Sequence, residues 1–133
     1  MEFIELTESL IESAEIKAKG LPFPEFVKEL KALGIDNYEV RVDSGDTTYT
    51  SKNGDKLVVP GRTAVFEPTE TFKVEAVRQA IQRNQQGLTS YSDFLQEIGQ
   101  AGIHTYLADL VSMRVIYQGP NSEYEYEEMI SEA

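Results

Sequence analysis

The sequence contains no cysteine and only one histidine, His104. Without cysteine, the chain has no disulfide, no thiolate nucleophile and no sulfur ligand for zinc. A single histidine also excludes a metal site that takes several histidines from one chain. These absences predict a protein with no resident metal ion and no cofactor, and the lack of disulfides is typical of a cytoplasmic protein.

Long apolar runs are also missing, because no stretch approaches the roughly 20 apolar residues that span a bilayer. Residues 1–5 are acidic where a secretory signal needs positive charge. The sequence therefore predicts neither a membrane span nor an export signal, in agreement with a cytoplasmic location.

Basic side chains are scarce, 12 against 23 acidic ones, and the formal net charge is −11. Such a charge repels phosphate backbones and anionic lipid surfaces, so we expect no direct nucleic-acid binding and no membrane binding. Acidity of this kind is typical of a soluble domain. It would also suit a basic protein partner or mimicry of DNA.

The 133 residues, 41% of them hydrophobic, suffice for a single domain, residues 1–133, with a buried core. Apolar residues recur at steps of three and four in four segments, which predicts four amphipathic helices. Phe26, Leu30, Phe94 and Ile98 are expected to be buried. The four stripes are Phe3, Leu6, Leu10, Ile11 and Ala14; Phe26, Val27, Leu30 and Leu33; Phe72, Ala76, Val77, Ala80 and Ile81; and Phe94, Leu95, Ile98 and Ala101.

Residues that favour helix ends flank these stripes. Pro24 suits the first position of the second helix, because its missing N–H would be unpaired there. Thr69 or Thr71 is predicted to cap the third helix, and Ser90 with Asp93 resembles a capping box for the fourth. Glycines with a left-handed backbone are predicted to end the four helices, namely Gly20, Gly34, Gly87 and Gly102.

Alternation of apolar and polar residues predicts strands after each helix pair. Asn53-Gly54 predicts a type I′ turn between two of them, with positive φ at both residues. The last strand is expected at an edge, with Tyr124 and Tyr126 on one face. Range 62–67 is left open between a strand and a loop. The expected strands are 38–43, 47–51, 57–59, 104–110, 113–117 and 123–127.

The two halves of the sequence can be superimposed with an offset of 68 residues, which predicts pseudo-repeats at about 3–60 and 70–127. Each half reads as two helices followed by a hairpin, and neither can bury its apolar face alone. We therefore predict an α+β two-layer sandwich, with about four helices packed on one mainly antiparallel sheet. The matched pairs include Phe26 and Phe94, Gly34 and Gly102, Ile35 and Ile103, Tyr38 and Tyr106, and Tyr49 and Tyr117.

Several motifs resemble the YdfO/YbcV-like family of small bacterial and prophage-carried proteins, some of which are labelled phage envelope protein. The resemblance covers nearly the whole chain and implies helices packed on a sheet, but no reaction. Many relatives carry His where this chain has Asn84 and Cys where it has Leu95, so chemistry based on either residue would be missing here. The motifs are GDTTY at 45–49, QGLTSYSDF at 86–94 and AGIHTY at 101–106, together with Asp109, Met113 and Tyr117.

Two sets of residues are candidates for a site. His104, Asp109 and Arg41 can be drawn as an acid–base cluster, in which Arg41 would hold a carboxylate or phosphate. Nothing in the sequence ties a second titratable group to His104, so a histidine at a strand edge is the favoured interpretation. The second set lies at paired positions of the two halves. The residues of this set either line a pocket on the axis that relates the two halves or pack on the sheet, and packing is favoured. This set is Tyr38, Tyr49, Tyr106 and Tyr117.

The sequence lacks a nucleophile with its base, a metal-ligand set and a cofactor loop. We therefore expect a non-enzymatic accessory module that acts through an unidentified protein partner. One alternative is an acidic DNA mimic of the anti-restriction type, and another is an enzyme with a site near His104. The charged last strand predicts a monomer, or at most a weak homodimer that strengthens as salt screens the charge.

Overall fold

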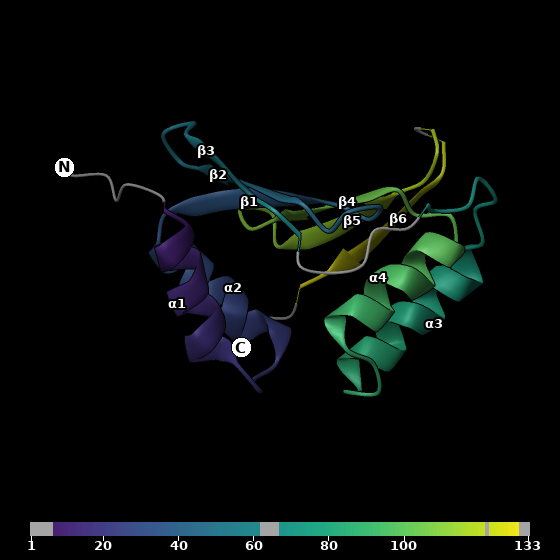
Figure 1. The fold of residues 1–133 in the computed structure, drawn as a ribbon, viewed down its shortest axis with the longest axis horizontal. Coiled ribbons are helices and arrows are strands. Elements are labelled where there is room, and N and C mark those ends of the chain that lie inside the picture. Colours follow the sequence, from purple (N-terminus) through teal and green to yellow (C-terminus); the bar gives the residue numbers. More distant parts are fainter. Residues whose placement is uncertain (1–6, 62–66, 122, 131–133) are drawn as a thin grey trace.

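Four helices cover one face of a six-stranded antiparallel sheet in this computed structural model, which describes residues 7–61, 67–121 and 123–130 (Figure 1). The α+β class and the two-layer arrangement predicted from the sequence are confirmed. The helices are α1 (Glu8–Ala18), α2 (Phe23–Ala32), α3 (Val74–Gln85) and α4 (Tyr91–Gln100). The strands are β1 (Ile35–Arg41), β2 (Thr47–Ser51), β3 (Lys56–Val59), β4 (Thr105–Asp109), β5 (Arg114–Gln118) and β6 (Glu125–Met129).

The two halves of the chain lie side by side in the sheet, whose strand order is β3-β2-β1-β4-β5-β6. Each half runs through two helices and three strands, and each helix pair lies beneath one end of the sheet (Figure 1). The halves join where β1 pairs with β4. At that join Glu39 lies opposite Leu107, the residue 68 positions later in the chain. The join therefore lies in the middle of the sheet, with one helix pair on either side of it.

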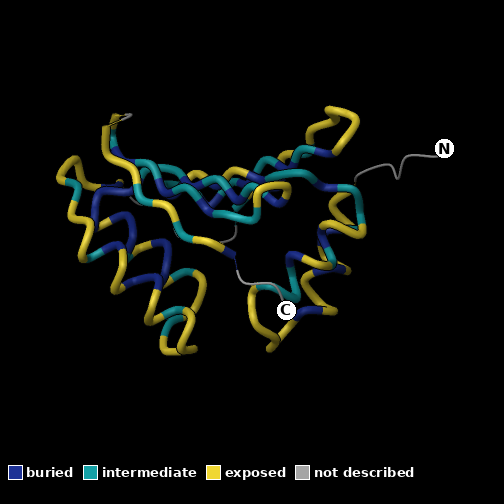
Figure 2. The backbone as a smooth tube through the Cα atoms, turned by 180° about the vertical axis from the view of Figure 1, so that it is seen from behind, coloured by how far each residue is buried: buried dark blue, intermediate teal, exposed yellow. Residues whose placement is uncertain are grey.

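The core lies between the helices and the inner face of the sheet (Figure 2). Leu30, Phe94 and Ile98 are buried there, as predicted from their helical spacing. Phe26 is only partly buried, so the expectation was wrong for this residue. The reason is local, because its ring borders a cavity instead of facing packed side chains on every side.

The starts of the first two helices differ in detail from the expected ones. Thr7 is the N-cap of α1, and its Oγ1 accepts a hydrogen bond from the N–H of Leu10 at 3.3 Å. Phe3 and Leu6, which belong to the predicted stripe, lie outside the described residues. Pro24 is the second residue of α2 and not the first, a position where its missing N–H is equally harmless.

The expected caps of α3 are wrong. This helix begins after Lys73, which makes no side-chain cap, and neither Thr69 nor Thr71 caps it. Backbone N–H groups of this segment donate instead to carbonyls at the C-terminal end of α4, and the Thr69 hydroxyl bonds there too, at 3.2 Å. Phe72 precedes the helix and stacks on Tyr124, with ring centroids 5.4 Å apart. The hydrogen bonds to the C-terminal carbonyls of α4 thus take precedence over an earlier start of α3.

The hairpin between β2 and β3 is not the predicted type I′ turn. Gly54 has a positive φ of 90°, whereas Asn53 is not among the described residues with positive φ. The N–H of Gly54 donates to the carbonyl of Ser51 at 3.0 Å, and the N–H of Ser51 donates to the carbonyl of Asp55 at 2.9 Å. This is a three-residue loop with glycine in the left-handed position. Asn53 Oδ1 accepts from the Asp55 N–H at 3.1 Å, which favours a right-handed Asn53.

Most expected strand positions are right to within a few residues, with two informative shifts. Met113 has a φ of 58° and belongs to the turn before β5, so the strand begins one residue later than predicted. Tyr124 precedes β6, which runs from Glu125 to Met129 at the edge of the sheet. Segment 62–66, left open above, lies outside the described residues. The predicted glycine helix ends are confirmed by their φ angles: 80° at Gly20, 83° at Gly34, 76° at Gly87 and 95° at Gly102.

Candidate functional site

Tyrosine rings form a row across the inner face of the sheet. Tyr38 lies opposite Tyr49 with ring centroids 5.4 Å apart, and Tyr106 lies opposite Tyr117 at 5.6 Å. Across the join, Tyr38 and Tyr106 are 6.5 Å apart, and Tyr126 continues the row in β6 at 6.3 Å from Tyr117. The first four rings are buried. The row therefore packs the two halves together.

A cavity of about 480 Å³ opens between the two helix pairs, above β1, β2 and β4. Tyr38, Tyr49 and Tyr106 form its floor, whereas Tyr117 is not among the lining residues. Three of the four candidate tyrosines thus both pack on the sheet and line a pocket. The rest of the lining comes from all four helices and from the ends of β2 and β3, and comprises Glu15, Phe23, Phe26, Gly45, Thr47, Val59, Pro60, Gly61, Ile81, Asn84, Gln85, Tyr91 and Phe94.

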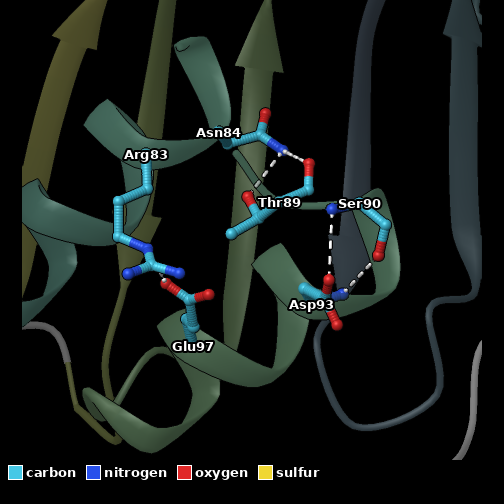
Figure 3. Close-up of polar contacts among 6 residues, drawn as sticks. All are labelled: Arg83, Asn84, Thr89, Ser90, Asp93 and Glu97. Carbon is cyan, nitrogen blue, oxygen red and sulfur yellow. Dashed lines mark hydrogen bonds and ion pairs between the residues drawn. The ribbon is translucent and has the colours of Figure 1, made fainter. Parts of the chain in front are cut away.

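The α3–α4 wall of the cavity is held by polar contacts between the two helices (Figure 3). Arg83 of α3 pairs with Glu97 of α4, with Nε 3.2 Å from Oε1. Asn84 Nδ2 donates to the carbonyl and the hydroxyl oxygen of Thr89, both at 3.3 Å. These contacts fix the end of α3 against the start of α4. They also direct the Asn84 amide to the connection between the helices, at the border of the cavity.

The start of α4 places a further aromatic ring at the cavity. Ser90 and Asp93 form the predicted capping box, in which each side chain accepts from the other residue's N–H (Figure 3). Tyr91 follows the cap directly, and its hydroxyl lies 2.7 Å from that of Tyr106 on the floor. The cap thus positions a bridge between the helix layer and the sheet.

The opposite end of the cavity is bounded by the β1–β2 turn and by the residues that follow β3, Pro60 and Gly61. Asp46 Oδ1 accepts a hydrogen bond from the N–H of Gly61 at 2.7 Å. A side chain at Gly61 would place its Cβ 1.9 Å from the carbonyl oxygen of Ser44, so only glycine fits there. This close approach joins the β1–β2 turn to the end of β3 and gives the cavity a firm wall.

Three phenol groups at the cavity, those of Tyr38, Tyr91 and Tyr106, have a raised pKa and stay protonated well above neutral pH. Burial raises the pKa of Tyr38 and of Tyr106 well above the usual value, and nearby tyrosines raise it further. Burial also raises the pKa of Tyr91 to about 12, although its hydrogen bond with Tyr106 acts in the opposite direction. The negative charge of Glu15 raises the Tyr91 pKa further, and both residues line the cavity. The cavity is therefore lined by neutral rings and hydroxyls with one carboxylate nearby.

The structure does not bring His104, Asp109 and Arg41 together. His104 and Asp109 flank the two ends of β4, about 16 Å apart at roughly 3.3 Å per residue. His104 Nε2 donates to the carbonyl of Thr69 at 3.0 Å, and Arg41 pairs with Asp43 at 2.8 Å. None of the three candidates lines the cavity.

Asp109 has a structural role at the end of its strand. Its Oδ1 accepts from the N–H groups of Val111 and Ser112 at 3.0 and 3.1 Å. Burial acts to raise the pKa of Asp109, but hydrogen bonds from Ser112 and Val111 and the charge of Arg114 lower it below its usual value. These contacts stabilise the ionised carboxylate in the β4–β5 turn, where it has no contact with the cavity.

Sequence reasoning missed several lining residues that no apolar periodicity marks. Phe23 and Tyr91 are the first residues of α2 and α4, and Glu15 lies on the polar side of α1. One signal for the aromatic pair was available. The offset of 68 residues that matches Phe26 with Phe94 also matches Phe23 with Tyr91.

Residues 7–61, 67–121 and 123–130 contain neither a candidate metal site nor a candidate membrane span. No three His, Cys, Asp or Glu side chains in these ranges come together as a possible metal site. No helix in the described part of the chain is both long enough and apolar enough to cross a membrane.

The chain was also compared with known proteins. Residues 13–129 match the sequence model of a family described as "Protein of unknown function (DUF1398)". This match includes every element from α2 to β6. A search of the curated proteins found no match.

Proposed function

The chain belongs to the DUF1398 family, and we propose that it serves as a non-enzymatic binding module that holds a small organic molecule between its helix pairs. The cavity carries this proposal, because about 480 Å³ lined mainly by aromatic and aliphatic side chains is a suitable volume for a ligand. Ligand sites typically have roughly 300–1,000 Å³ and mostly apolar walls with a few polar groups.

The lining chemistry supports binding in preference to reaction. Among the described lining residues there is no histidine, cysteine, serine or lysine that could act as a base or nucleophile. The one aliphatic hydroxyl, on Thr47, donates to the carbonyl of Gly45 at 3.3 Å. Tyr91 and Tyr106 share their hydroxyls with each other. The enzyme alternative near His104 has less support, because Asp109 lies at the far end of β4 and the His104 ring bonds to the carbonyl of Thr69 instead of to a candidate partner.

Protein binding through the outer face of the sheet is a second candidate function. The described helices leave this face uncovered (Figure 2). A row of paired residues, one from each of the strands β1 to β5, crosses it. Leu107 and Ile116 are partly exposed at its centre, and Val58 is 61% exposed near one edge. Such a mixed surface suits a transient partner. Photocrosslinking from position 116 in cells should give one discrete crosslinked protein, and only diffuse background would count against this candidate.

The DNA-mimic alternative has less support. A mimic needs carboxylates spaced like phosphates along one ridge, free of basic neighbours. Here ion pairs combine acidic with basic side chains across the molecule, between α1 and α2, within α3, between α3 and α4 and between β5 and β6. The excess acidity is therefore better explained by solubility.

We also infer that this chain is related to the YdfO/YbcV-like proteins of bacteria and prophages, and that the protein acts in the cytoplasm. The motifs at 45–49, 86–94 and 101–106 support the first inference. The absence of cysteine supports the second, because proteins of oxidising compartments commonly carry disulfides.

We further propose that the protein is a monomer at low salt and forms at most a weak homodimer as salt rises. β6 is an edge strand that carries Glu125, Glu127 and Glu128, and like charges across a strand pair are unfavourable. The ring of Tyr126 packs on Tyr117 and is not free to contact a second copy. Sedimentation velocity across a salt series measures this directly. A tight dimer at low salt would contradict the prediction.

The cavity proposal can be tested with three small aromatic probes, namely neutral indole, cationic benzamidine and anionic benzoate. At least one of them should shift amide resonances of cavity residues in a protein-observed NMR titration. Gln85→Trp places a bulky ring at the exposed rim of the cavity and should abolish these shifts. Gln82→Trp adds the same ring to an exposed position of α3 outside the cavity and should leave them unchanged.

His104→Ala serves as a second control, because this residue lies outside the cavity and should not affect binding. The proposal is wrong if none of the probes shifts cavity resonances. It is also wrong if Gln85→Trp, shown to be folded by its thermal transition, binds every probe as well as Gln82→Trp does.

A further inference from the structure

We propose that the cavity takes an aromatic molecule that carries a carbonyl group, and that the hydroxyl of Tyr38 donates a hydrogen bond to the carbonyl oxygen. This inference rests on the proposed function, since it names the class of molecule that the same cavity would hold and the residue that selects it. Three features of the described residues support it: the aromatic lining, the hydrogen bonding of the hydroxyls on the floor and the protonation of Tyr38.

The aromatic lining indicates the kind of surface that a ligand would present. Tyr38, Tyr49 and Tyr106 form the floor, and the walls include Phe26 of α2 and Phe94 of α4, so rings reach the cavity from the sheet and from both helix pairs. Phe26 meets Tyr38 and Phe94 meets Tyr106 edge to face, with ring centroids 6.5 and 6.3 Å apart. An aromatic ligand can extend this packing, because ring pairs gain free energy beyond the area that they bury.

The Tyr38 hydroxyl is a polar group on the floor that lacks a partner in the described part of the chain. The side chain is only 4% exposed, and its ring makes its contacts, with Phe26, Tyr49 and Tyr106. No described residue forms a hydrogen bond with the hydroxyl. Asp43 Oδ1 is nevertheless the only fully buried side-chain oxygen or nitrogen without a partner among these residues. The Tyr38 oxygen is therefore not sealed in the core, and it is reached from the cavity that its ring lines.

The hydroxyls of Tyr91 and Tyr106 differ from that of Tyr38 because they already bond to each other, at 2.7 Å. Their bond uses one of two hydrogens, so the pair can supply one further donor beside Tyr38. A carbonyl oxygen has two lone pairs and no hydrogen of its own, and it can accept from either donor or from both. A hydrocarbon of the same shape would leave the Tyr38 donor dry and unpaired, which costs affinity.

The protonation of Tyr38 makes it a donor and not a base. Burial raises the pKa of Tyr38 well above its usual value, and Tyr91 and Tyr49 raise it further. The hydroxyl therefore keeps its hydrogen at neutral pH and well above it. A donor of this kind holds a carbonyl oxygen without forming an ion in the cavity.

The experiment compares acetophenone with α-methylstyrene, which has the same shape but carries a CH2 group in place of the carbonyl oxygen. The informative quantity is the ratio of the two dissociation constants, measured by NMR titration of the full chain in wild type and in Tyr38→Phe, because the different hydration of the free probes cancels in this comparison. Tyr38→Phe should weaken acetophenone binding about fivefold relative to α-methylstyrene binding, since only the ketone loses a hydrogen bond. An unchanged ratio overturns the inference.

Tyr117→Phe is the matched control. Tyr117 belongs to the same row of rings and is buried, but it does not line the cavity, so removal of its hydroxyl should leave the ratio unchanged. An equal fall in both variants would also overturn the inference, because the preference would then come from the packing of the row and not from a contact in the cavity.

The infrared stretching band of the bound ketone provides a second readout. A hydrogen bond weakens the C=O bond, so the band should lie at a lower frequency in wild type and in Tyr117→Phe than in Tyr38→Phe. The same frequency in all three proteins would show that Tyr38 does not contact the carbonyl oxygen.

The outcomes separate this inference from the proposed function. If indole or α-methylstyrene binds in the cavity and Tyr38→Phe changes neither the ratio nor the carbonyl band, the cavity is a ligand site that does not select a carbonyl group. If none of the probes binds in a manner that Gln85→Trp abolishes, both proposals are wrong.

Discussion

Raising the pH above about 10, the usual pKa of tyrosine, is expected to unfold the protein in one cooperative step. Burial raises the pKa of Tyr38, Tyr106 and Tyr117, so the folded protein keeps protons that the unfolded chain loses. The stability linked to these groups is complete below the unfolded pKa and falls as the pH rises above it. For each pH unit above the unfolded pKa, each group lowers the free energy of unfolding by about 1.4 kcal/mol, so the three together lower it by roughly 4 kcal/mol. The total free energy of unfolding of a typical protein is only about 5–15 kcal/mol.

Far-ultraviolet circular dichroism and tyrosinate absorbance, recorded over the same alkaline titration, measure this unfolding. The two signals should change together, because these tyrosines ionise only when the sheet opens. Tyr117→Phe removes one linked group and should make the alkaline loss of stability less steep. Tyrosine ionisation that is complete while the helix signal persists would contradict the prediction.

Gly102→Ala is expected to destabilise the protein by about 3–5 kcal/mol, combining left-handed strain with overpacking. Gly102 ends α4 with a φ of 95°, a conformation that costs a side chain roughly 1–2 kcal/mol. In addition, an added Cβ would lie 2.5 Å from the carbonyl oxygen of Thr71 and 2.6 Å from the Cα of Phe72. Both contacts are with backbone, which cannot move aside as a flexible side chain would.

Gly34→Ala provides the matched control, because Gly34 ends α2 at the corresponding position of the other half. Its φ is 83°, but an added Cβ would meet nothing within 4 Å. Only the cost of the left-handed backbone remains, so the free energy of unfolding of this variant should fall by about 1–2 kcal/mol. Chemical denaturation of both variants gives the two values. Equal losses would show that segment 71–72 moves away from Gly102 without cost.

The fold could be predicted from the sequence where local physics determines the backbone. Helix periodicity, the Ser90–Asp93 capping box and glycine helix ends depend on neighbouring residues alone, and all are confirmed. Two of the predictions that were wrong involve competing hydrogen bonds, one set with a distant segment and one within a turn. The start of α3 was misplaced because Thr69 and its neighbours bond to the end of α4. The turn at Asn53 was misassigned because the asparagine side chain bonds to the backbone of Asp55.

The candidate site could be predicted only in part. The repeat offset identified Tyr38, Tyr49 and Tyr106, but sequence alone could not show that the helix pairs stand apart above them. Tyr117 illustrates the limit, because it matches Tyr49 in sequence and in pairing yet does not line the cavity. The cavity extends over β2 and β3 rather than over β5 and β6, so it does not follow the symmetry of the strands.

The pairing of β1 with β4 also bears on how the chain folds. Within each half, the strands are neighbours in sequence, so each half can form from local contacts, whereas the central pair joins segments about 68 residues apart. Glu39 and Leu107 occupy corresponding positions of the two halves, so two chains that exchange halves would make the same central pairing between molecules. Refolding from concentrated, denatured protein is therefore the condition that favours domain-swapped dimers, and dilution should favour the monomer.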